Sequence, residues 1–181
     1  MQIMVKNWQQ AFEQMLKSEG GFTDDERDNG NKLPDGRKGS TMLGVTQYNW
    51  EQHVGHQVTH DDMRKLTAAD VEPLYKKKYW DVVQGDKLPN GIDYLVFDMG
   101  VNAGPGRSIK ILQTAVGTTP DGGLGPITMA AVWAVDPAVL IEKFSAEKEA
   151  FYRSLDTFSV YGTGWLNRVA AVKLKATSMI G

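Results

Sequence analysis

The stretch Trp8-Gln9-Gln10-Ala11-Phe12-Glu13-Gln14-Met15-Leu16-Lys17-Ser18-Glu19-Gly20-Gly21 (residues 8–21) decides the fold class. Its large apolar residues recur at helical spacing, so one stripe of a helix over residues 5–18 faces a core. The members of this stripe are Trp8, Phe12, Met15 and Leu16. Two adjacent glycines then end the helix, because they adopt backbone angles closed to other residues. Glu19 is therefore predicted to lie at the C-terminal edge of a helix.

The rest of the chain alternates between one long polar loop and further helices. Residues 22–42 are rich in Gly, Asp and Asn, which predicts loops with at most a short hairpin. Helical patterns and capping residues predict helices over 46–54, 67–80, 92–101, 106–116, 125–135, 137–155 and 164–177, with a short helix or turn at 59–64. No strand-helix repeat occurs, so a parallel sheet is not expected. The predicted fold is mainly α, with a small β or loop element near the N-terminus.

Composition and charge exclude several classes of function. The 181 residues carry a net charge of −2, so no basic field draws the chain to nucleic acid or anionic lipid. The chain has no cysteine, and therefore neither a disulfide framework nor a thiolate metal site. Residues 1–10 lack the apolar core of a signal peptide, and no later run has membrane-spanning length. We expect a protein that is made in the cytoplasm and has no membrane anchor.

Two groups of side chains resemble metal sites only superficially. The acids in residues 24–28 lack the alternation, central glycine and final glutamate of a calcium loop, so a solvated turn explains them better. The three histidines, His53, His56 and His60, have no acid or cysteine that completes a zinc ligand set at a suitable spacing. We expect no metal and no cofactor.

Glu19 suits the role of a general acid in the hydrolysis of a glycosidic bond. That reaction needs a carboxyl group that stays protonated near neutral pH and a second group that handles water or the developing cation. The helix C-terminus before Glu19 disfavours the carboxylate, and the neighbouring glycines let a sugar chain approach closely. The alternative is an ordinary glutamate at the end of a helix.

An ordered series of motifs resembles glycoside hydrolase family 108, the lysozyme-like muramidases common among phage and prophage endolysins. The series comprises Ser18-Glu19-Gly20-Gly21-Phe22, Gly39-Ser40-Thr41-Met42-Leu43-Gly44-Val45-Thr46, Tyr75-Lys76-Lys77-Lys78-Tyr79-Trp80-Asp81, Asp98-Met99-Gly100-Val101-Asn102-Ala103-Gly104, Leu112-Gln113, Asp121-Gly122-Gly123-Leu124-Gly125 and Gly164-Trp165-Leu166-Asn167-Arg168-Val169. Each motif alone is weak, but their order is specific.

The resemblance implies a lysozyme-like fold with two helical lobes around a cleft. Residues 1–90 would form the catalytic lobe and residues 91–181 a peptidoglycan-binding lobe, packed as one compact unit. The implied activity is that of an endolysin-type N-acetylmuramidase, which hydrolyses the β-1,4 bond between N-acetylmuramic acid and N-acetylglucosamine in peptidoglycan. Such an enzyme works without a cofactor, as a monomer, and is released to the periplasm at lysis through a separately made membrane pore.

The resemblance also assigns the catalytic residues. Glu19 matches the family's catalytic glutamate, and Thr41 matches the threonine on the opposite side of the cleft. The family commonly shows Asp-x-Gly-Gly-x-Thr before this threonine, whereas residues 35–41 read Asp-Gly-Arg-Lys-Gly-Ser-Thr, one residue longer. Asp35 is the first choice for a second carboxylate, and Asp28 is the next.

Candidates for substrate binding follow from the later motifs. Asp98 and Asn102 lie one turn apart on an apolar helix, which fits either a cleft wall or a buried hydrogen-bonding role. Tyr79 could be a sugar platform or, with Trp80, part of the core. Lys76 and the two lysines after it could pair with muramic lactyl groups and stem peptides, or form a solvated face.

Two other functions remain open at this point. The same architecture would also serve a glycosidase that cuts chitin or the other linkage of peptidoglycan. A different class of protein, a peptidoglycan-binding or secretion-assisting module without catalysis, would also fit, although an intact Glu19 in its glycine context argues against it.

Overall fold

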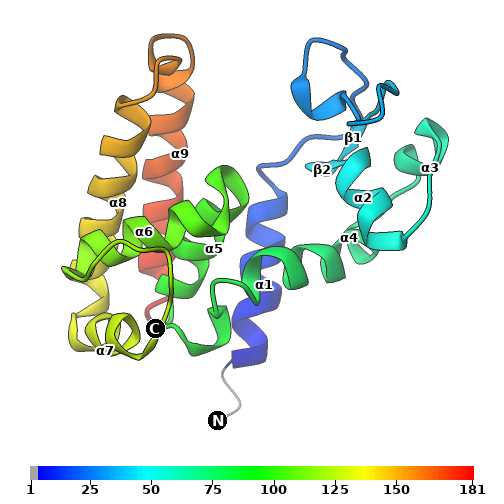
Figure 1. Ribbon diagram of the computed structural model, residues 1–181. Helices are drawn as coiled ribbons and strands as arrows, with labels where there is room; N and C mark the ends of the chain where they lie inside the picture. The colour runs from blue at the N-terminus through cyan, green and yellow to red at the C-terminus, as the bar shows by residue number, and fades with distance from the viewer. Residues whose placement is uncertain (1–3) are drawn as a thin grey trace. The chain divides into compact units, whose positions relative to one another are not determined.

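The computed structural model describes residues 4–181, and it is mainly helical (Figure 1). The α-helices are α1 (Met4–Leu16), α2 (Gln47–Val54), α3 (His60–Arg64), α4 (Ala68–Tyr75), α5 (Ile92–Ala103), α6 (Pro105–Val116), α7 (Pro126–Ala134), α8 (Pro137–Arg153) and α9 (Phe158–Ser178). Short helical turns lie at Asn29–Asn31, Lys76–Trp80 and Gly85–Lys87. The strands β1 (Thr41–Met42) and β2 (Val45–Thr46) pair antiparallel, with Thr41 opposite Thr46. The prediction of a mainly α fold with a small β element near the N-terminus is confirmed.

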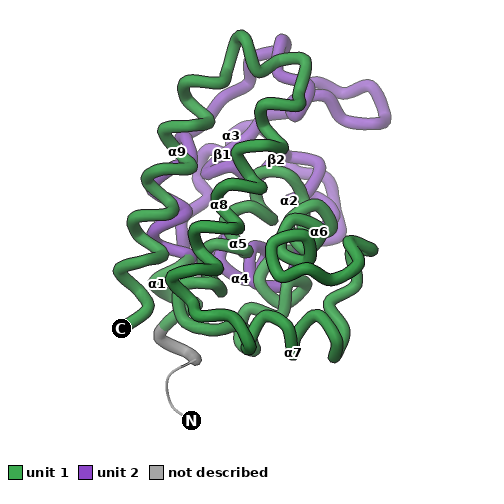
Figure 2. Tube along the Cα trace, turned by 90° about the vertical axis from the view of Figure 1, so that its left-hand side faces the viewer, with its two compact units in different colours: residues 1–11, 79–181 green, residues 12–78 purple. Residues whose placement is uncertain are grey.

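The chain divides into two compact units, coloured separately in Figure 2. Unit 2 comprises residues 12–78, and unit 1 comprises residues 1–11 and 79–181. The first boundary thus falls inside α1, so the opening residues of this helix belong with the C-terminal half of the sequence. The expected division into a catalytic lobe of residues 1–90 and a peptidoglycan-binding lobe of residues 91–181 stays a prediction.

Unit 2 begins with the end of α1 and continues through the hairpin to α4. Its helices start where capping residues predict them. The Thr46 hydroxyl accepts a hydrogen bond from the N–H of Asn49 at the start of α2. The predicted capping box of Thr67 and Asp70 opens α4. The α-helix ends at Tyr75, earlier than the predicted residue 80, and continues to Trp80 as a π-helical turn.

Unit 1 is built around α5, whose residues 92–100 are all buried. α5 packs against α6, α8 and α9, and α8 and α9 form an antiparallel pair (Figure 1). An aromatic cluster of Trp8, Trp80 and Phe97 fills the other side of the core, with ring centroids 5.3 to 5.6 Å apart. Gly91 directly precedes α5, and its positive φ of 86° turns the chain into the helix. None of the described helices is both long and apolar enough to cross a membrane.

α9 differs from its prediction at its start. We expected a helix over 164–177, but it begins at Phe158 and so contains Gly162 and Gly164. Two glycines close together disfavour a helix by backbone entropy. Aromatic packing offsets this cost, because the ring of Trp165 stacks on Tyr152 of α8 at 5.1 Å and Phe158 lies across Gly162. Such contacts between helices are not visible in local sequence.

Candidate functional site

Glu19 lies in the turn that ends α1. Its N–H donates a hydrogen bond to the carbonyl of Leu16 (3.0 Å), which continues the last helical turn. The side chain is half-buried. The structure thus places Glu19 at the C-terminal edge of a helix, as the glycine pair predicts.

The turn of the β1–β2 hairpin lies against this glutamate. Its two residues, Leu43 and Gly44, have positive φ values of 51° and 77°, as the central residues of a type I′ turn require. Positive φ is uncommon for a residue such as leucine and costs about 1–2 kcal/mol. The phenol of Tyr75 donates a hydrogen bond to the Leu43 carbonyl (2.8 Å), which stabilises this strained turn. Strain of this kind gathers at functional sites.

Gly44 is the point where the hairpin meets Glu19. A Cβ atom on Gly44 would lie 2.7 Å from Oε2 of Glu19 and 2.5 Å from the phenol oxygen of Tyr75. Both distances are shorter than a Cβ contact allows, so a side chain here would have to displace the Glu19 carboxyl and the Tyr75 phenol. The carboxyl of Glu19 and the phenol of Tyr75 therefore flank the same backbone position, which fixes the acid beside the hairpin that carries Thr41.

Thr41 is held at the start of this hairpin by two kinds of hydrogen bond. Its backbone forms a bridge with Thr23, with N–H to carbonyl distances of 2.9 and 2.8 Å. Its hydroxyl donates to Oδ1 of Asn31 (2.7 Å), and Asn31 is buried and donates in turn to the Asp25 carbonyl (2.9 Å). Since the hydroxyl proton is committed to Asn31, the Thr41 oxygen can act only as an acceptor toward a further group.

Asp35 lies in a different network. Arg37 donates to Asp35 (2.8 Å) and, through both terminal nitrogens, to Glu51 on α2 (2.8 and 2.7 Å). These hydrogen bonds hold the pKa of Asp35 below its ordinary value and lower the pKa of the buried Glu51 to about 2. Asp35 is thus a carboxylate at neutral pH and shares its cation with Glu51. Asp28, the second choice, accepts a hydrogen bond from Gly30 (2.8 Å) and caps a helical turn.

The candidates for substrate binding lie in varied surroundings. Asp98 is fully buried, and it accepts hydrogen bonds from Arg168 (3.0 Å), Lys148 (3.4 Å) and Asn102 (3.3 Å). The spacing prediction that Asp98 and Asn102 reach the same side is confirmed, and only Asn102 is exposed. Burial of Asp98 favours its structural alternative, whereas direct contact with substrate stays a prediction.

Lys76 and Tyr79 lie in the π-helical turn after α4, and both are half-buried. Trp80, at the end of this turn, is fully buried and belongs to the core of unit 1. Burial lowers the pKa of Lys78, whose ammonium donates to Asn49 (2.6 Å). A role in substrate binding for Lys76 and Tyr79 stays a prediction. Over residues 4–181, no three His, Asp or Glu side chains gather as metal ligands.

Comparisons with known proteins agree with the family resemblance of the motifs that contain Glu19 and Thr41. The family model for glycosyl hydrolase 108 matches residues 12–104, which is more than half of the chain. The chain belongs to glycosyl hydrolase family 108. A second family model, described as a predicted peptidoglycan domain, matches residues 107–170. The chain is therefore a glycoside hydrolase, with peptidoglycan as its substrate or partner.

The family 108 hydrolase is also similar to a solved structure, that of Brucella abortus SagA. The two are 31% identical in sequence and superpose with a TM-score of 0.83, over 97% of each chain. The comparison with curated proteins gives no match.

Three residues of the hydrolase's site escaped the sequence analysis as functional candidates. Gly44 and Tyr75 stand inside motifs that carry the family resemblance, yet their meeting at Glu19 depends on contacts between distant segments. Asn31 lies in a polar loop, where composition predicts exposure, but it is buried as the partner of Thr41. A buried asparagine in a loop gives no periodic signal, so only the structure reveals it.

Proposed function

We propose that this hydrolase is an N-acetylmuramidase that cuts the β-1,4 bond between N-acetylmuramic acid and N-acetylglucosamine, with Glu19 as its catalytic acid. The observation that carries the proposal is the position of the Glu19 side chain. Its carboxyl is fixed against Gly44 of the hairpin that begins with Thr41. Gly20 and Gly21, which follow Glu19, have no atom within 4 Å of a Cβ position, so they leave room for a polymer to approach the acid closely.

The roles of the two residues follow from their hydrogen bonding. Glu19 would donate its proton to the oxygen of the leaving sugar as the glycosidic bond breaks. The Thr41 oxygen, whose own hydrogen is donated to Asn31, would accept a hydrogen bond from the attacking water and so orient it. Asp35, which Arg37 keeps ionised, would add a negative charge that stabilises the cation formed at the sugar.

The biological setting belongs to the same proposal. We place the enzyme among endolysins that are made in the cytoplasm, act as monomers and reach the wall from the periplasm at lysis. Its muramidase specificity and its role in bacteriolysis are supported by family membership and by the second matched region. Two alternatives compete with this proposal. One is a glycosidase that cuts chitin or the other linkage of peptidoglycan, and the other is a binding module without catalysis.

Replacement of Glu19 by Gln tests the acid. The amide keeps the shape of the side chain but has no proton to give, so lysis of purified cell walls should fall by at least about 10²–10⁴-fold. Glu13→Gln, on the exposed face of the same helix, is the matched control and should keep wild-type activity. Retained lysis by a Glu19→Gln variant with native thermal melting would overturn the assignment.

The same assay separates the second catalytic group. Thr41→Ser keeps the acceptor oxygen and should be mild, whereas Thr41→Ala should cost about 10²-fold or more in turnover. Asp35→Asn should lose a similar factor if its charge acts on the substrate. Wild-type turnover of Asp35→Asn would leave the role to Thr41 alone or move it to Asp28.

A further inference from the structure

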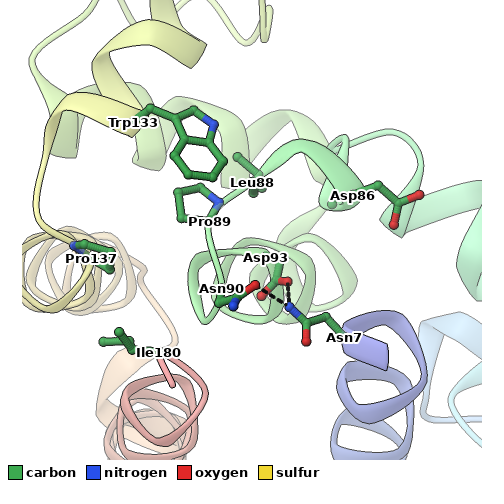
Figure 3. Close-up of a pocket in the computed structure, with 10 residues that line it drawn as sticks. Asn7, Asp86, Leu88, Pro89, Asn90, Asp93, Trp133, Pro137 and Ile180 are labelled. Atoms are coloured by element: carbon green, nitrogen blue, oxygen red, sulfur yellow. Dashed lines mark hydrogen bonds between the residues drawn. The ribbon is translucent and has the colours of Figure 1, made fainter. Parts of the chain in front are cut away.

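A pocket in unit 1 shares no residue with the Glu19 site. It has a volume of about 420 Å³, within the range of small-molecule sites. Its walls come from α1, the segment before α5 and the first turn of α5, α7, the start of α8 and Ile180 (Figure 3). The lining side chains that matter for binding are Asn7, Asp86, Asn90, Asp93 and Trp133.

Trp133 gives this pocket an apolar face. Its side chain on α7 is 58% exposed, which is unusual for so large an apolar ring. The indole N–H donates to the Lys87 carbonyl (3.0 Å), so the orientation of the ring is fixed. Pro89 lies beside the indole (Figure 3). A fixed indole with an exposed face matches the flat C–H face of a pyranose ring, because both are apolar surfaces with polar edges.

Two amide side chains supply the polar part of the pocket. The Asn7 amide donates to Oδ1 of Asn90 (2.7 Å) and to Oδ2 of Asp93 (2.9 Å). These bonds use both hydrogens of Asn7 and the oxygen of Asn90. Among the side chains described, those of residues 7–181, the Asn7 oxygen and the Asn90 nitrogen are left as one acceptor and one donor. An N-acetyl group presents the complementary pair, an N–H and a carbonyl.

The charge of the pocket selects among sugars. Asp86 is exposed at its edge, and Asp93 lies at its base, with a pKa that burial raises to about 6. None of the ten residues that line the pocket is basic. The lactyl carboxylate of N-acetylmuramic acid and the carboxylates of stem peptides would therefore meet like charge without a cation. A neutral N-acetylated sugar avoids this repulsion.

We infer that the pocket lined by Trp133, Asn90 and Asn7 is a non-catalytic site for an N-acetylglucosamine residue of the glycan strand. The inference rests on the proposed function, which supplies the strand. The pyranose ring lies on the indole, and the N-acetyl group bonds to the two asparagines. The site holds the polymer while the Glu19 site cuts it.

The direct test is titration of the full chain with N,N′-diacetylchitobiose, followed by NMR of the tryptophan indole N–H signals. The Trp133 signal is identified by its loss in Trp133→Phe. We expect this signal to shift saturably, and cellobiose, which lacks N-acetyl groups, to leave it unmoved. An unmoved Trp133 signal at millimolar chitobiose, or an equal shift with cellobiose or with a free stem peptide, would overturn the inference.

A second test uses strands in the Glu19→Gln background, so that binding is measured without cleavage. Trp133→Ala should weaken co-sedimentation with purified peptidoglycan at least tenfold. Ile127→Ala is the matched control, because Ile127 is 80% exposed on the same helix and does not line the pocket. Asn90→Ala removes an exposed side chain and should weaken binding at least threefold with the fold intact.

The outcomes of these tests distinguish the two proposals. If Trp133→Ala binds strands as tightly as Ile127→Ala does, the pocket is not a glycan site, whatever the activity of Glu19. If Glu19→Gln still lyses walls, the proposed mechanism fails, while the indole titration still reports on the pocket. In an otherwise wild-type chain, Trp133→Ala should raise KM on intact strands at least threefold and leave kcat on a short soluble fragment unchanged.

Discussion

Gly44 shows how a single residue can serve both backbone and chemistry. Its positive φ of 77° favours glycine, and the space where a Cβ would lie is taken by the carboxyl of Glu19 and the phenol of Tyr75. The positive φ is a requirement of the hairpin turn, and the lack of space is a requirement set by Glu19, the proposed catalytic acid. A substitution with a matched control can separate them.

We predict that Gly44→Ala lowers the rate of wall lysis by about 10²-fold. The new methyl group would displace the Glu19 carboxyl, and a displacement of about 1 Å costs a factor of this size. The control is Gly36→Ala, where φ is 88° but no atom lies within 4 Å of a Cβ. Gly36→Ala should lose only about 1 kcal/mol of stability, from backbone strain, and keep its activity. The two variants are compared by lysis rate and by thermal melting, and equal activities would show that Gly44 does not position the acid.

The candidate residues that the sequence could indicate are those whose signal is local. Glu19 could be selected from its helix end and glycines, and Thr41 from its motif. The partners Tyr75 and Asn31 could not, because each acts through a hydrogen bond to a residue far along the chain or across a loop. The ion pairs of Arg37 were missed for the same reason, and they change the surroundings of Asp35.

At the scale of elements, caps predicted the starts of helices better than periodicity predicted their lengths. Thr46, Thr67 and Asp136 cap α2, α4 and α8 at their expected positions, since capping depends on neighbours within three residues. The start of α9 was misplaced by six residues, because its glycines are offset by aromatic contacts with α8. A long-range contact here overrides a local propensity.

The two glycines of α9 give an element-scale prediction. Gly164→Ala should raise the free energy of unfolding by about 0.5–1 kcal/mol, because a Cβ there meets open space and alanine favours a helix. Gly162→Ala should lower it by about 1 kcal/mol or more, because its Cβ would lie 2.6 Å from the ring of Phe158. Denaturant titration checks both, and equal stabilisation by the two substitutions would show that Phe158 does not pack on Gly162.

The whole molecule combines two matched regions in one chain. The hydrolase region, residues 12–104, reaches beyond unit 2 and includes α5, which is the buried centre of unit 1. The two compact units therefore do not coincide with the two matched regions. The sequence could not predict the boundary between the units, because it falls inside the continuous helix α1. The family resemblance, by contrast, was readable from motifs spread along the chain.

The most direct test of the central claim is the reducing end that the enzyme leaves on purified peptidoglycan. Products of the wild-type chain and of Glu19→Gln are reduced with borohydride and analysed by mass spectrometry. A muramidase with Glu19 as its acid gives fragments that end in N-acetylmuramitol, and the Glu19→Gln variant gives none. Fragments that end in N-acetylglucosaminitol, or muramitol products from Glu19→Gln at the wild-type rate, would contradict the account.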